Sequence, residues 1–137
     1  MSKINQIYYL VDKLFENEGD GWRLALDKSK AFSVLIGNNQ SATEISRYEW
    51  SVLVPLVFEI KEQLDSAKLS LIDEEKISIE IERDIWWAHV EGDKNEWNLS
   101  VILTYQDQSK RGIEMSWQYP SSESLLIGMR LMWDSYQ

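Results

Sequence analysis

Apolar and polar side chains alternate along three runs between residues 77 and 117 of this 137-residue chain. The alternating apolar positions are Ile77, Ile79 and Ile81, then Trp97, Leu99, Val101, Leu103 and Tyr105, then Ile113, Met115 and Trp117. A period of two is typical of a strand with one buried face. Because short polar turns separate the runs, we predict an antiparallel meander whose isoleucine-bearing face lies in the core.

A further run, IWWAHVE at residues 85–91, is apolar on both faces. Its alternate positions fall into two sets, which are Ile85, Trp87 and His89, and Trp86, Ala88 and Val90. We expect Trp87 to lie with the isoleucines in the core, which leaves Trp86 and Val90 on the outer face. Either this outer face contacts a partner, or a second element such as the N-terminal segment covers it.

The N-terminal segment carries a helical pattern instead. Between residues 4 and 15, apolar side chains recur every three or four positions with charged side chains between them. This spacing is typical of one face of an amphipathic helix. We therefore predict a leading helical arm over residues 1–17, ended by a turn at Gly19 and Gly21.

The remaining chain divides into two units of strands followed by a helix. In the first unit, residues 22–67, three short strands precede a helix that begins with a capping box at Ser46 and Glu49. Pro55 within this helix should kink it. The second unit, residues 77–136, contains the meander and a closing helix after Pro120. The sequence therefore predicts an α+β protein, a single domain over residues 1–137 in which both units share one core.

Composition narrows the possible functions. The chain has no cysteine, which excludes disulfides and cysteine nucleophiles and fits a reducing compartment. No apolar run approaches the roughly 20 residues of a membrane-spanning helix, and the first residues do not resemble a signal peptide. We therefore expect a soluble cytoplasmic protein. Its 23 acids against 14 Lys and Arg give a net charge of −9, which repels phosphate backbones and anionic lipid surfaces.

The residues offer little for catalysis. His89 is the only histidine, and Glu91 is the carboxylate on its strand face that could orient it. A lone histidine provides neither a catalytic triad nor a two-histidine metal site, so we interpret it as a partly buried residue of the sheet. The chain also lacks a phosphate-binding glycine loop and a nucleophile elbow. We predict no enzymatic activity, no metal and no cofactor.

Four segments carry a resemblance to a known family, and they read NEGDGWRLALD, IGNNQSATEISRYEW, LIDEEKISIEIERDIWWAHVEG and RGIEMSW. Together, over residues 18–131, they resemble the cyanobacterial family named domain of unknown function 1818. That family is similar in fold to the Whirly-type single-stranded-DNA-binding transcriptional regulators, which repeat a unit of strands followed by a helix. The resemblance implies this fold, and it assigns no catalytic or binding residue.

Two kinds of binding function remain open. In the predicted orientation the outer sheet surface carries glutamates and small polar side chains with no basic residue, so a nucleic-acid backbone would meet like charge. We therefore predict a non-enzymatic binding or regulatory module that engages a protein partner or a second copy of itself. Its candidate contact residues are Trp86, Val90 and Arg83. The alternative is binding of single-stranded nucleic acid, with the same residues as a stacking surface.

Overall fold

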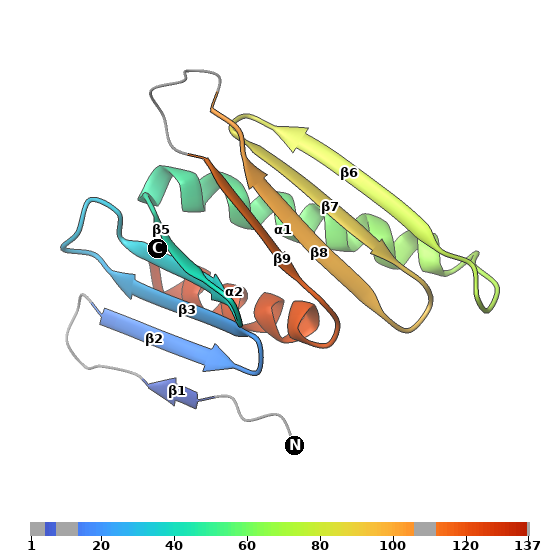
Figure 1. The fold of residues 1–137 in the computed structure, drawn as a ribbon, viewed down its shortest axis with the longest axis horizontal. Helices are drawn as coiled ribbons and strands as arrows, with labels where there is room; N and C mark the ends of the chain where they lie inside the picture. The colour runs from blue at the N-terminus through green and yellow to red at the C-terminus, as the bar shows by residue number, and fades with distance from the viewer. Residues whose placement is uncertain (1–4, 8–13, 106–111, 137) are drawn as a thin grey trace.

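The computed structural model describes residues 5–7, 14–105 and 112–136, which form two antiparallel sheets and two helices (Figure 1). Sheet A contains, in chain order, β1 (Asn5–Ile7), β2 (Leu14–Gly19), β3 (Trp22–Asp27), β4 (Val34–Asn38) and β5 (Ala42–Ile45). Sheet B contains β6 (Ile77–Arg83), β7 (Trp86–Gly92), β8 (Trp97–Leu103) and β9 (Ile113–Trp117). The helices are α1 (Arg47–Lys68) and α2 (Ser121–Tyr136). The predicted α+β class is confirmed.

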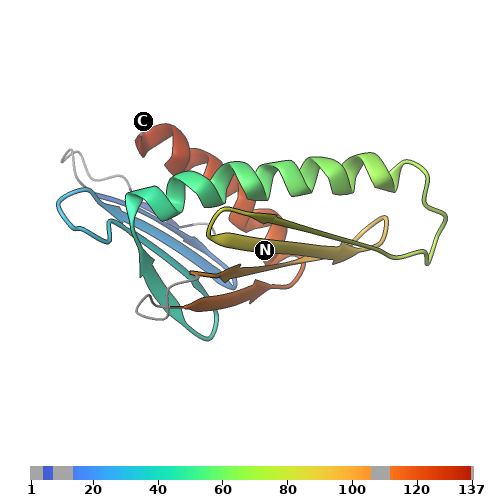
Figure 2. The same ribbon diagram turned by 90° about the horizontal axis from the view of Figure 1, so that it is seen from above.

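Each helix packs on the sheet of the other half of the chain. α1 follows sheet A in sequence but contacts β6 and β7 of sheet B, whereas α2 follows sheet B but contacts β2 and β3 of sheet A. Both helices lie on the same side of the two sheets (Figure 2). The two strand-then-helix units are therefore interlocked, and the buried side chains of both form one cluster between the helices and the sheets.

Hydrogen bonds also join the two sheets directly. The indole Nε1 of Trp117 on β9 donates to the carbonyl of Gly37 on β4, with 3.0 Å between the two atoms. Beside it, the side-chain amide of Asn38 donates to the carbonyl of Ser116, again over 3.0 Å. Because a buried indole N–H is costly to leave unpaired, the first bond fixes where β9 meets sheet A.

The capping box at the start of α1 is confirmed. Ser46 Oγ accepts from the backbone N–H of Glu49 at 3.1 Å, and Glu49 Oε1 accepts from the backbone N–H of Ser46 at 2.8 Å. The helix then runs to Lys68 as one continuous element with Pro55 on its exposed side. A kink at Pro55 stays a prediction. The residues that α1 buries are Glu49, Trp50, Leu53, Val54, Leu56, Val57, Ile60 and Leu64.

The predicted N-terminal helical arm is wrong in the part that the structure describes. Asn5–Ile7 and Leu14–Gly19 are strands β1 and β2, and residues 8–13 lie outside the described residues. β2 pairs with β3 along its whole length, through a tight turn in which Gly21 adopts a φ of 79°. Pairing of β2 with β1 and β3 satisfies its backbone groups, and the strand also packs against α2. These interactions outweigh a local helical pattern.

Candidate functional site

The register of sheet B decides which face of β7 is buried. Ile79 pairs with Val90 and Arg83 with Trp86, so Trp86 and Val90 share the face of the β6 isoleucines. That face is covered by α1, and both side chains are fully buried. The indole of Trp86 also donates to the backbone carbonyl of Glu49 at 2.9 Å. The expectation that Trp86 and Val90 face outward is therefore wrong.

The cause of this error lies in the turn before β7. Asp84 adopts a positive φ of 53°, and the turn makes Trp86 the first residue paired with β6. Because side chains alternate with a period of two, a turn one residue longer or shorter would exchange the two faces of β7. The run IWWAHVE is apolar on both faces, so its pattern alone does not reveal the choice.

Arg83 also does not join a contact surface with the other two predicted residues. Its guanidinium forms an ion pair with Glu59 of α1, with Nη2 and Oε2 2.5 Å apart. The arginine side chain is 46% exposed, and the pair connects the end of β6 to the middle of α1. Trp86, Val90 and Arg83 are thus two core residues and one ion-paired edge residue.

The opposite face of sheet B carries a different aromatic group. Trp87 and His89 of β7 stack on each other there, with ring centroids 5.6 Å apart and planes inclined by 12°. Ile102 of β8 is the cross-strand neighbour of Trp87, and all three side chains are half-buried. We call Trp87, His89 and Ile102 the outer patch. Neither helix covers it, because both helices lie on the other side of the sheet (Figure 2).

Four exposed glutamates surround the outer patch. Glu82, Trp87, Ile102 and Glu114 are successive cross-strand neighbours from β6 to β9, so the two glutamates lie at the two ends of this row. Glu80 on β6 is the cross-strand neighbour of His89, and Glu91 lies two residues after His89 on the same face of β7. Arg83 is the only Lys or Arg in the four strands of sheet B, and it is held on α1. Among Asp, Glu, Lys and Arg, only glutamates lie on the outer face of these strands.

His89 is the half-buried sheet residue that the sequence predicts. Its Nε2 forms a hydrogen bond of 2.6 Å with Ser78 Oγ on β6, rather than an orienting contact with Glu91. A serine beside a histidine is one part of a nucleophilic site, but catalysis also needs donors that stabilise an oxyanion. His89 lies on β7, which pairs with a strand on each side, and Ser78 lies on the edge strand β6.

Glu49 is the one buried carboxylate among the described residues, and structural contacts explain it. Besides its role in the capping box, its Oε2 accepts from the hydroxyl of Tyr105 at 2.5 Å. Among the described residues, no group of three His, Cys, Asp or Glu side chains is placed to hold a metal ion. No described helix is both long and apolar enough to cross a membrane.

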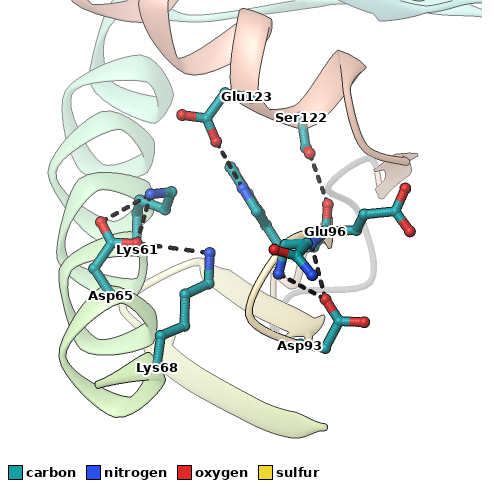
Figure 3. A network of polar contacts seen from close by, with 9 residues as sticks. Lys61, Asp65, Lys68, Asp93, Glu96, Ser122 and Glu123 are labelled. Atoms are coloured by element: carbon teal, nitrogen blue, oxygen red, sulfur yellow. Dashed lines mark hydrogen bonds and ion pairs between the residues drawn. The ribbon is translucent and has the colours of Figure 1, made fainter. Parts of the chain in front are cut away.

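A polar network fixes the end of sheet B nearest the start of α2 (Figure 3). In the turn between β7 and β8, Asp93 Oδ1 accepts from the backbone N–H groups of Glu96 and Asn95, and these bonds lower the pKa of Asp93. Trp97 donates from Nε1 to Glu123 on α2 at 2.8 Å. Ser122, next to it, donates to the carbonyl of the same tryptophan at 2.8 Å. The network holds the strand and the helix together and leaves the outer patch open.

The fold and this surface define an α+β protein with two antiparallel sheets, interlocked helices and one uncovered acidic and aromatic sheet face. The sequence profile of DUF1818, described as a domain of unknown function, matches residues 17–132, and the chain belongs to that family.

Among solved structures, the chain is similar to a protein from Prochlorococcus sp. NATL2A, described as a protein with unknown function from the DUF155 family. The two sequences are 37% identical, and the TM-score is 0.82 over 88% of this chain and 98% of that chain. A comparison with curated proteins found no match. The solved structure shares the fold, and neither it nor the family match assigns a ligand.

Proposed function

We propose that the protein is a non-enzymatic binding module whose outer patch engages a basic segment of a protein partner. The observation that carries the proposal is the stacked pair of Trp87 and His89 between exposed glutamates. An aromatic surface supplies apolar contact area, and the carboxylates around it select positive charge. The aromatic surface and the carboxylates together suit an arginine-containing peptide segment as the ligand.

The geometry of the row through Trp87 suits such a segment. Strands in a sheet are spaced by about 4.8 Å, so Glu82 and Glu114, three strand spacings apart, are separated by roughly 14 Å between their Cα atoms. A guanidinium stacked over the indole would gain about 1 kcal/mol from the cation–π contact. Basic side chains on either side of this arginine in an extended peptide would reach the carboxylates of Glu82 and Glu114. These contacts add charge complementarity and orient the peptide.

Single-stranded nucleic acid is the second candidate. The stacked rings are a surface on which bases could stack, and the likeness to Whirly-type regulators that the sequence leads us to expect would favour the same function. The four glutamates count against it, because a phosphate backbone laid on the patch would meet Glu80, Glu82, Glu91 and Glu114. We therefore rank a basic protein partner first.

The cytoplasm is the compartment that fits this proposal. The chain contains no cysteine, so its stability does not depend on an oxidising environment.

The test is a fluorescence-anisotropy titration at low salt with two labelled probes, a short peptide of alternating Arg and Ser, and oligo-dT. A double variant, Glu82→Gln with Glu114→Gln, removes two charges beside the patch. Its control, Glu62→Gln with Asp134→Asn, removes two exposed charges on the helices. We expect the patch variant to weaken peptide binding about tenfold and the control to change it less than about twofold.

Three outcomes would redirect the proposal. Equal peptide affinity in both double variants would mean that net charge alone attracts the peptide, and the patch would lose its role. Tighter binding of oligo-dT than of the peptide would favour the second candidate. A dimer in light scattering that Trp87→Ala dissociates would make a second copy of the chain the occupant.

A further inference from the structure

A positively charged pocket lies far from the outer patch, where the ends of several elements meet. It has a volume of about 350 Å³ and is lined by Lys28, Lys30, Ala31, Ser33, Arg47 and Tyr136. These residues come from the turn between β3 and β4, the first residue of α1 and the last residue of α2. Both ribbon views place the end of α2 near the beginning of α1 (Figures 1 and 2).

Two cations in this pocket converge on one aromatic ring. Lys28 Nζ lies 5.7 Å from the ring centroid of Tyr136, and the guanidinium carbon of Arg47 lies 5.1 Å from it. Within the described residues, neither cation forms an ion pair with a carboxylate. Like charges gathered at one place repel each other, and an anion between them would relieve that repulsion.

The floor of the pocket adds a hydroxyl donor. Ser33 and Tyr136 are only 5% and 7% exposed, and their hydroxyl groups are hydrogen-bonded to each other. Each of the two hydroxyl groups carries one proton, and the hydrogen bond between them uses only one of these two protons. The group that accepts in this bond therefore keeps its own proton, which it can donate to a ligand in the pocket.

Two contacts partly offset the positive charge of this pocket. Lys30 pairs with Glu44 at 3.5 Å, and both of those side chains are at least half exposed, so solvent screens the pair. Lys28 donates to the carbonyl of Ser135 at 3.4 Å, near the negative end of the α2 dipole. That partial charge offsets about half of one cation, and Arg47 and the free hydroxyl proton remain.

We propose that this pocket binds a phosphate group. A tetrahedral oxyanion suits this set of donors, because guanidinium, ammonium and hydroxyl groups all donate to oxyanion oxygens. The pocket volume exceeds that of a phosphate group, so it also accommodates the first atoms of a phosphate monoester. Free phosphate and a small phosphate monoester share this chemistry. The site is independent of the outer patch and would hold even if the patch bound nothing.

Calorimetric titration with inorganic phosphate and with glycerol 3-phosphate tests the proposal, against sodium chloride of matched ionic strength. We expect saturable binding by the wild-type protein that weakens about tenfold in Arg47→Gln, since one charge-assisted bond is lost. Tighter binding of the ester than of free phosphate would assign the site to a phosphorylated ligand, and equal binding would assign it to the ion.

Three further variants complete the test. Tyr136→Phe keeps the ring and removes the hydroxyl, so it should weaken binding by a smaller factor. Lys94→Gln, which removes a cation at the turn between β7 and β8, should leave binding unchanged. Should Arg47→Gln fail to fold, Lys28→Gln replaces it, because Lys28 lies in an exposed turn and its loss should also weaken phosphate binding. No saturable heat, or an equal effect of Arg47→Gln and Lys94→Gln, would overturn the proposal.

Discussion

Trp86 and Trp87 are neighbours in the chain and lie on opposite faces of β7. The first is fully buried under α1, where its indole donates to the carbonyl of Glu49. The second stacks on His89 on the uncovered face. One tryptophan therefore contributes to the stability of the fold, and the other is available for binding.

Truncation of the two tryptophans should separate these roles. Trp86→Ala removes a buried aromatic ring and its hydrogen bond, so we expect it to lower the free energy of unfolding by about 3–5 kcal/mol or to prevent folding. Trp87→Ala removes a half-buried ring on an open face and should cost less than about 1.5 kcal/mol. Urea unfolding followed by circular dichroism measures both. Similar losses in the two variants would contradict the assignment of faces.

The capping box of α1 should contribute measurably to stability. Ser46→Ala removes the side-chain acceptor for the N–H of Glu49, and we expect a loss of about 1 kcal/mol. Ser51→Ala, at an exposed position of the same helix, is the control and should change stability by less than about 0.5 kcal/mol. Should both variants unfold at the same urea concentration, the cap would have no special role.

A close contact between α2 and sheet A should make Gly128 intolerant of a side chain. A Cβ at Gly128 would lie 2.5 Å from the ring of Trp22, which is fully buried against it. We expect Gly128→Ala to destabilise the protein by about 1–3 kcal/mol, although alanine favours helices. Gly112→Ala is the control, since its Cβ would meet no atom of the described residues closer than 3.9 Å apart from its chain neighbours. Stabilisation by Gly128→Ala would show that α2 packs differently.

Asp93 should make stability depend on pH in the acid range. Hydrogen bonds from the backbone N–H groups of Glu96 and Asn95 hold the pKa of Asp93 below its ordinary value of 3.8. A carboxyl whose pKa is lowered by folding stabilises the fold above the unfolded-state pKa, and this contribution is lost as the pH falls through the lowered value. The stability difference between wild type and Asp93→Asn should therefore shrink below about pH 4. Thermal unfolding from pH 2 to pH 6 measures it, and a constant difference would be contrary to the assigned bonds.

The interlocked helices predict that neither half of the chain folds alone. A fragment ending at residue 70 would leave the apolar face of α1 without β6 and β7, and sheet A without α2. We expect this fragment to lack a cooperative thermal transition, because each half buries its apolar surface only against the other. Mixing it with the fragment that begins at residue 71 should restore the transition. A cooperative transition in the first fragment alone would argue against this interdependence.

The sequence predicts most of the fold because its patterns are local. Alternation in the sheet B strands and the spacing of Ser46 and Glu49 place elements within a residue or two of where they lie. The N-terminal strands are missed because pairing between β2 and β3 decides their conformation, and the helical spacing of residues 4–15 carries no information about that partner.

The candidate site is harder to predict, since it depends on one turn. The pattern identifies the strand that carries the outer patch but assigns its two faces in reverse, because the residue count of the turn at Asp84 sets the face. The phosphate pocket has no local signal at all. Lys28, Arg47 and Tyr136 lie far apart in sequence, and only the tertiary fold brings them together.

The most direct test of the proposed function observes the seven tryptophan indoles by ¹⁵N NMR during titration with the Arg-Ser peptide. Each indole N–H gives its own resonance, assigned by substitution. We expect the Trp87 indole to shift progressively and saturably, while the buried indole of Trp86, bonded to Glu49, stays in place. Saturable shifts confined to other tryptophans, with Trp87 unchanged, would contradict the proposal that the outer patch is the binding surface.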